Sequence, residues 1–321
     1  MKGLAFVRRA DVTEKIVDTA IHFTFAAVFS GARLFGGYAP FAVGFCAAAG
    51  PGRRGLAALL GCAAGSLLFL DFSHALRTIA AAVLLYTANN AFCDMKCYQK
   101  KAFLPLMSAG MMLSVEFVYA VKGGAGEAAY CLLCLLLAAL SAHCCRSVLR
   151  GEEEGKAAIL VVVLGVLTAL SAFETRSGFA PGRIAAMFIV LLLAFERDMA
   201  YAVASALCIG VAVDLAAQNG SFLHTAVYAL GALAVSFARR GDRVRAALWF
   251  AAAVLIFSLP LYAGEGLVLL YEGLAATLCF LILPTKAFSG KRLAAPESTK
   301  ADGQSFVQEK LEESAAAFRE L

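Results

Sequence analysis

Charged residues are scarce in this chain of 321 residues. They make up 16% of it, whereas a soluble domain uses roughly 25% to cover its surface. Hydrophobic residues account for 61%, and the mean hydropathy is +0.78. This balance argues against a water-soluble protein, because too few polar side chains are present to cover its surface. We expect lipid to take the place of water around most of the chain.

Motifs of soluble enzymes are also missing. The chain has no glycine-rich phosphate loop, no H-E-x-x-H and no pair of carboxylates on a loop long enough to shape a pocket. Cys131 and Cys134 form a C-x-x-C, but no nearby histidine completes a zinc set. Most of the ten cysteines lie in apolar runs, where cysteine acts as a small hydrophobe. We therefore expect no catalytic residue, no cofactor or metal site and no nucleic-acid partner.

The chain does contain a series of long apolar runs. Most approach the roughly 20 residues with which a helix crosses the core of a bilayer. They are continuous rather than alternating, which favours helices over barrel strands. The runs near 39–50 and 184–195 are shorter and could be re-entrant. The sequence thus predicts an all-α fold, a polytopic transmembrane helix bundle of about ten to twelve membrane segments within residues 16–285. The runs lie near 16–35, 39–50, 55–70, 75–93, 103–121, 128–145, 157–173, 184–195, 199–217, 222–237, 246–262 and 266–284.

Basic residues indicate how such a bundle is oriented. If the N-terminal segment, residues 1–15, is cytoplasmic and every run crosses the membrane, the gaps between runs lie alternately outside the cell (outer gaps) and in the cytoplasm (inner gaps). The inner gaps then hold about three times as many Lys and Arg residues as the outer gaps, a bias typical of cytoplasmic loops. No cleavable signal pattern precedes the first run. We expect a multi-pass protein of the cell (plasma) membrane with both termini in the cytoplasm. The outer gaps hold Arg33, Lys122, Arg176 and Arg183, with Arg77 just inside a run, and the inner gaps hold Arg53, Arg54, Lys96, Lys100, Lys101, Arg146, Arg150, Lys156, Arg197, Arg239, Arg240, Arg243 and Arg245.

After the last run the composition becomes polar. Residues 286–304 form a basic linker, which we expect to be cytoplasmic. Residues 305–321 begin with the pattern of a capping box, Ser305 to Gln308. An apolar stripe then predicts the start of an amphipathic regulatory or dimerisation helix, apparently truncated, although a frayed tail is the simpler alternative. The stripe consists of Val307, Leu311, Ala315, Phe318 and Leu321.

Ionisable residues at membrane depth are candidates for function, because each costs about 2.5–3.5 kcal/mol or more at a helix centre. We expect Arg77, Asp71 and Glu116 to lie near enough to an interface to reach water. Glu272 lies deeper, and we expect it to pair with Arg33 or Arg77. The full set is Glu272, Arg77, Arg33, Glu116, Asp71 and Asp214.

The runs also divide into six plus six. The second run of each half is short and follows a proline motif, Ala39-Pro40-Phe41 or Phe179-Ala180-Pro181, and the third ends in aspartate, Asp71 or Asp214. Interrupted helices at matching places in two halves are typical of transporters. A small-molecule or ion transporter is therefore the alternative to a membrane anchor.

The order of several short motifs resembles the membrane-embedded N-terminal region of the stage II sporulation protein E family of endospore-forming bacteria. The resemblance covers the chain from about residue 16 to its end. The motifs are Gly31-Ala32-Arg33 leading into Pro40-Phe41-Ala42; Ala185-Ala186-Met187-Phe188-Ile189-Val190 followed by Glu196-Arg197-Asp198; Leu270-Tyr271-Glu272; Leu283-Pro284; and Lys310-Leu311 to Ala317-Phe318-Arg319-Glu320-Leu321.

The resemblance implies a membrane anchor and oligomerisation region for a serine/threonine phosphatase of the PP2C type. In that family the phosphatase binds manganese or magnesium and acts on a phosphorylated anti-anti-sigma factor, and the protein gathers with the tubulin-like division protein at the asymmetric septum. This chain stops where the regulatory segment would begin, so no catalytic residue carries over. We expect either a fragment or a truncated relative that forms homo-oligomers.

Overall fold

The computed structural model describes residues 2–35, 37–151, 155–175, 178–217, 222–238, 242–260 and 263–283. Within these ranges the chain folds into eleven α-helices and one short 3-10 helix, Lys96–Gln99, without a strand. The predicted all-α fold is therefore confirmed. The predicted linker, 286–304, and the tail stripe lie outside the described residues.

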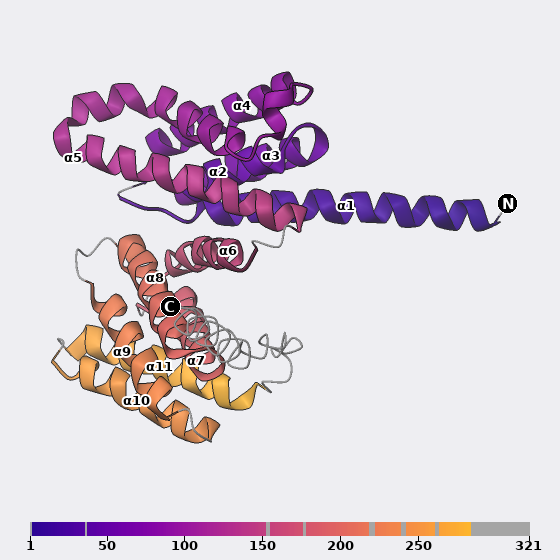
Figure 1. Ribbon diagram of the computed structural model, residues 1–321. Coiled ribbons are helices and arrows are strands. Elements are labelled where there is room, and N and C mark those ends of the chain that lie inside the picture. Colours follow the sequence, from indigo (N-terminus) through magenta and orange to yellow (C-terminus); the bar gives the residue numbers. More distant parts are fainter. Residues whose placement is uncertain are drawn as a thin grey trace, which may run out of the picture.

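The first five helices fill the upper part of Figure 1. The fifth, α5, is interrupted at Gly124, whose φ of 83° is available to glycine at little cost. The chain folds back there into two arms (Figure 1), which correspond to the predicted runs 103–121 and 128–145. The helices are α1 (Lys2–Ser30), α2 (Pro40–Ala49), α3 (Gly52–Phe69), α4 (Phe72–Phe92) and α5 (Phe103–Arg150).

The remaining six helices form the lower part of Figure 1. The predicted short run 184–195 belongs to a longer helix, α7, which begins at Pro181 and has 16 residues. A proline fits the first turn of a helix because the missing N–H has no intrahelical partner there. Of the two runs predicted to be short, only α2, with 10 residues, stays markedly short. The helices are α6 (Gly155–Ser171), α7 (Pro181–Glu196), α8 (Met199–Ala217), α9 (Leu223–Ala238), α10 (Arg243–Ser258) and α11 (Ala263–Ile282).

Two of the described helices, α5 and α8, are long and apolar enough to cross a membrane by length and composition. Four further helices are apolar but shorter, with the apolar parts Pro40–Ala49, Ala158–Ser171, Leu223–Phe237 and Gly266–Ile282. The structure thus supports an association with membrane by this criterion. The larger number of crossings stays a prediction.

The described residues form two hydrophobic cores. One is built almost wholly from α1 to α5 and the other from α6 to α11. The second helix of each group is central: α2 packs against α1, α3, α4 and α5, and α7 packs against α6, α8, α9 and α11. The groups meet where α6 packs against α1 and α5. The six-plus-six pattern of the sequence therefore has a counterpart in how the helices pack.

Two glycines allow α1 and α3 to approach closely. A Cβ atom on Gly61 would lie 2.1 Å from the carbonyl oxygen of Phe23, and one on Gly65 would lie 2.4 Å from that of Ala27. Small residues four apart commonly bring helices this close. The G-x-x-x-G motif is thus used for packing within one chain.

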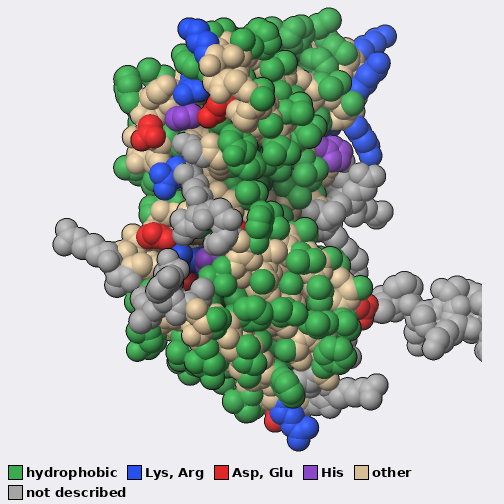
Figure 2. All heavy atoms as spheres, turned by 90° about the vertical axis from the view of Figure 1, so that its left-hand side faces the viewer, with side chains coloured by type: hydrophobic (Ala, Val, Ile, Leu, Met, Phe, Trp, Pro, Cys, Tyr) green, Lys and Arg blue, Asp and Glu red, His purple; other side chains and the backbone are tan. Residues whose placement is uncertain are grey.

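The outward faces of the helices are apolar. Leu68 of α3 is 74% exposed, and Leu136 of α5 and Ile256 of α10 are exposed by 60% and 64%. Figure 2 shows one face of the molecule, on which hydrophobic side chains cover most of the surface and charged ones form a few small clusters.

Candidate functional site

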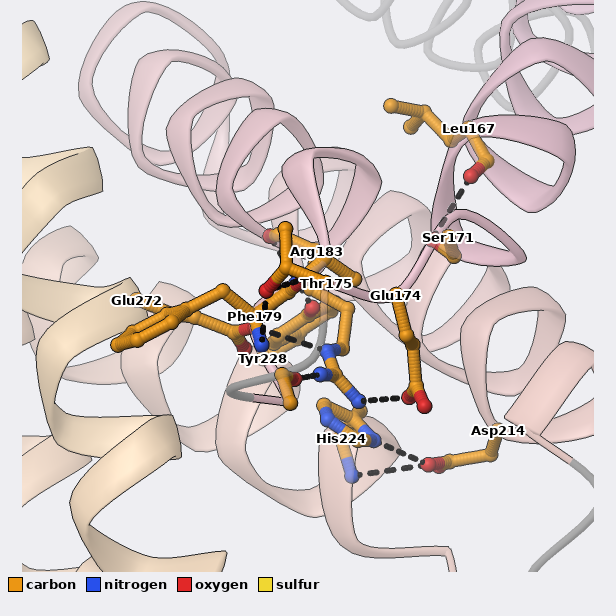
Figure 3. A network of polar contacts seen from close by, with 12 residues as sticks. Leu167, Ser171, Glu174, Thr175, Phe179, Arg183, Asp214, His224, Tyr228 and Glu272 are labelled. Atoms are coloured by element: carbon orange, nitrogen blue, oxygen red, sulfur yellow. Dashed lines mark hydrogen bonds and ion pairs between the residues drawn. The ribbon is translucent and has the colours of Figure 1, made fainter.

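The first candidate site is a buried ion pair at the start of α7. Glu272 of α11 is only 1% exposed. Its Oε1 accepts hydrogen bonds from Nε of Arg183, at 3.0 Å, and from the backbone N–H of Ala180, at 2.9 Å. Because Pro181 opens α7, the carboxylate lies at the positive end of the helix dipole, where a negative charge is stabilised. Figure 3 shows the carboxylate and guanidinium facing each other across the two helices.

Arg183 also holds the loop that leads into α7. Its guanidinium donates to Oε1 of Glu174, at 3.1 Å, and to the carbonyl oxygen of Gly178. In the same loop Thr175 exchanges hydrogen bonds with Phe179, its hydroxyl donating to the carbonyl and accepting from the N–H. One arginine thus connects the loop, the first turn of α7 and the middle of α11 (Figure 3).

The second site joins α8 to α9. The carboxylate of Asp214, which is 5% exposed, accepts from the backbone N–H of His224 and Thr225 at 3.1 and 2.8 Å. It also contacts Nδ1 of His224 at 2.7 Å and accepts from the hydroxyl of Thr225 at 2.6 Å. These are the free N–H groups of the first turn of α9, so Asp214 acts as an N-cap supplied by another helix. The hydroxyl of Tyr228, in the next turn of α9, donates to the carbonyl oxygen of Arg183 at 3.4 Å, which joins the two sites (Figure 3).

The first half contains a comparable pair. Nη1 of Arg77 on α4 lies 3.0 Å from Oε2 of Glu116 on α5, and their side chains are 12% and 6% exposed. The guanidinium also stacks over the ring of Tyr119, 4.1 Å from its centroid. Arg77 and Glu116 are thus paired with each other and largely shielded from solvent, and their distance from a membrane interface stays a prediction.

The N-terminus of α2 lies beside a second set of polar groups. The hydroxyl of Tyr38, two residues before Pro40, donates to Glu127 at 3.2 Å, and its ring meets that of His74 edge-on, with the centroids 5.6 Å apart. Burial, with smaller contributions from Glu116 and Glu127, raises the pKa of Tyr38 well above its usual value, so the phenol stays a donor. A tyrosine just before α2 thus reaches a glutamate of α5, and α7 begins where the backbone contacts Glu272 of α11.

The other predicted site residues have simpler places. Arg33 is half-buried in the loop between α1 and α2, and Asp71 is exposed at the N-cap position of α4. The predicted pairing of Glu272 with Arg33 or Arg77 is wrong, because its partner is Arg183. The physical reason is that each half packs around its own core, which brings the first turn of α7 against α11 and keeps Arg77 with Glu116.

A polar group at the opposite end of α2 has no clear signal in the sequence. The side-chain amide of Asn89 donates to the carbonyl oxygens of Cys46 and Ala47, and the hydroxyl of Tyr98 donates to Oδ1 of Asn89 at 3.1 Å. Burial raises the pKa of Tyr98, which keeps this hydroxyl protonated. Arg146 donates to the carbonyl oxygens of Lys100 and Gln99, which fixes the neighbouring 3-10 turn. Since α2 ends inside the bundle, its last carbonyls need such partners.

The hydrogen bonds and ion pairs at these sites hold neighbouring helices together. In the described ranges no three His, Cys, Asp or Glu side chains come together as a metal site. Oε2 of Glu272 is buried without a hydrogen-bond partner among the described atoms, while Oε1 carries both contacts.

No family model matches the chain, and no curated protein and no solved structure matches it either.

Proposed function

We propose that the chain is a multi-pass anchor of the cell membrane. The observation that carries this proposal is the inverted distribution of polarity: large apolar side chains cover the outward helix faces, and charged ones are paired inside or gathered at helix ends. Soluble monomers rarely expose a continuous apolar area of more than a few hundred Å². Lipid requires such a surface, and it requires charges at membrane depth to be paired.

The ion pairs also support the proposed orientation. In a topology with cytoplasmic termini, Arg77 and Arg183 are basic residues on the outer side. Both are paired with buried glutamates, Glu116 and Glu272. Their charges are therefore balanced inside the protein, whereas the inner side keeps Arg53, which is exposed, and other unburied basic residues. The exposed Lys and Arg side chains of the described residues therefore lie mainly on the proposed cytoplasmic side, where such residues are enriched.

The anchor holds a cytoplasmic partner domain. By its resemblance to the stage II sporulation protein E family, we propose that the chain forms homo-oligomers at the polar division septum with the tubulin-like division protein. It would there present a phosphatase acting on a phosphorylated anti-anti-sigma factor in sigma-factor activation. Manganese or magnesium would belong to that phosphatase. The rigid halves and their interhelical ion pairs suit an anchor, which needs fixed geometry.

Localisation tests this proposal. A fluorescent protein fused after Leu321 and expressed in an endospore-forming bacterium should gather at the asymmetric septum when sporulation starts. The matched control carries Leu311→Asp and Phe318→Asp in the tail stripe, which should reduce self-association and leave membrane insertion intact. Uniform fluorescence of the unaltered fusion around the cell would argue against a septal anchor. Sequencing past Leu321 should reveal the phosphatase.

A transporter is the second candidate, favoured by one observation. The central helices α2 and α7 occupy equivalent places in two similarly packed halves, and both begin beside glutamates. Matching helix termini near a repeat interface are where transporters bind substrates. Under this alternative, Glu272→Gln would abolish a growth-linked uptake activity without altering localisation. Under the anchor proposal the same change would affect stability alone.

A further inference from the structure

Two hollows adjoin on the surface where α1 and α3 face each other. The first, of about 490 Å³, is lined mainly by the apolar side chains of Ile16, Ala20, Phe23 and Leu60. The second, of about 500 Å³, is lined by Pro51 and by five polar or charged side chains. Lys15, Thr19 and Arg53 line both hollows, so the two form one continuous amphiphilic groove.

The polar hollow is positively charged. Three basic side chains, Lys15, Arg53 and Arg54, line it against one acidic side chain, Asp18. Asp18 balances one of these basic side chains, because its Oδ2 lies 2.6 Å from Nε of Arg54. Among the side chains that line this hollow, basic ones therefore outnumber the acidic one, which favours an anionic ligand.

The position of the groove fits the headgroup level of a bilayer. In Figure 1 the N-terminal part of α1 extends beyond the other helices, and residues 15–24 of α1 line the groove. The proposed orientation puts this end of α3, with Arg53 and Arg54, in the cytoplasm. Ile16 and Leu60 are 63% and 54% exposed, so an acyl chain could reach them from the surrounding lipid.

We propose that this groove binds one anionic phospholipid of the inner leaflet. Its phosphate lies among Lys15, Arg53 and Arg54, and one acyl chain lies along Ile16, Phe23 and Leu60. A free anion would leave the apolar hollow empty, and a zwitterionic lipid would place its own cation among three basic side chains. The inference rests on the membrane insertion proposed above and adds a specific lipid to it.

Native mass spectrometry of the full chain in detergent tests the proposal. The probes are phosphatidylglycerol and phosphatidylcholine with identical acyl chains, and glycerol phosphate as the soluble headgroup. Phosphatidylglycerol should bind more tightly than phosphatidylcholine, and glycerol phosphate should not compete. Lys15→Gln with Arg53→Gln should weaken phosphatidylglycerol binding about 25-fold, since each basic contact is expected to contribute about fivefold.

Two further variants complete the design. Ala20→Trp, at an exposed position, should fill the apolar hollow and weaken the binding of both lipids. Lys96→Gln with Arg245→Gln removes the same charge from exposed sites away from the groove and should leave binding unchanged. Any of four results would overturn the proposal: the two lipids bind equally, the two double variants lose binding equally, Ala20→Trp has no effect, or glycerol phosphate competes. A chain that stays in the aqueous fraction would instead refute membrane insertion itself.

Discussion

Breaking the Arg183–Glu272 pair should destabilise the second half strongly. Glu272→Leu would leave Nε of Arg183 and the N–H of Ala180 buried without their acceptor. Removing one partner of a buried ion pair costs about 3–5 kcal/mol in soluble proteins. Polar contacts between membrane helices contribute less, about 0.6–1.7 kcal/mol, because the unfolded helices find other partners in the membrane.

The burial of Glu272 decides between these ranges. The side chain of Glu272 is 1% exposed and that of Arg183 is 10% exposed. Little solvent therefore screens the charge of Arg183 once Glu272 is removed. We therefore expect Glu272→Leu to lower the free energy of unfolding by about 3 kcal/mol, which is roughly a hundredfold in the equilibrium constant. The double variant Arg183→Leu with Glu272→Leu should cost about 2 kcal/mol less than the sum of the single changes, because neither member of the buried pair is then left without the other.

Unfolding by denaturing detergent in mixed micelles measures these differences. The single tryptophan, Trp249, lies on α10, which packs against α11, so its fluorescence reports on the second half. The control Glu174→Leu removes the partner of Arg183 that is 54% exposed, and it should cost less than about 1 kcal/mol. Strictly additive effects in the double variant, or a cost of Glu272→Leu as small as that of the control, would refute the reasoning.

Three other changes probe the remaining contacts. Asp214→Ala should lower the unfolding free energy by about 2 kcal/mol in the same assay, since two N–H groups of α9 lose their cap; an unchanged midpoint would contradict the capping role. Gly61→Ala should be destabilising because its Cβ would lie 2.1 Å from a backbone oxygen of α1, whereas Gly110→Ala meets nothing within 4 Å and should be neutral or better; equal midpoints would argue against the close approach. Leu311→Asp with Phe318→Asp should abolish crosslinking through the tail without releasing the chain from membranes, and undiminished crosslinking would exclude the stripe from self-association.

The positions of the helices could be predicted because each apolar run has to bury its backbone in a helix. Each predicted run overlaps a helix or, for 103–121 and 128–145, one arm of α5, although α1 begins at Lys2, well before the predicted run 16–35. The extent of α7 was underestimated because apolar length alone was counted. Pro181 at the first position of the helix was the available signal, since proline is favoured there.

The partner of Glu272 could not be predicted from composition or spacing. Arg183 stands just before an apolar run, a place that predicts a loop residue, although a helix starting at Pro181 puts it in the first turn. Even then, its pairing depends on α7 packing against α11, a contact between residues 89 positions apart. Asp214 is likewise an unusual charge in the sequence, but its role as a cap for α9 requires α8 and α9 to pack against each other.

The side of the membrane on which each loop lies tests the account most directly. Paired reporters, alkaline phosphatase for the outside and a fluorescent protein for the cytoplasm, can be inserted after Gly124, at the turn between the arms of α5, and after Gly151, at the end of α5. The account predicts active phosphatase at Gly124 and fluorescence at Gly151. The account is contradicted if the phosphatase is active at Gly151 or if the same reporter is active at both positions. Recovery of the chain from lysate without detergent would contradict it too.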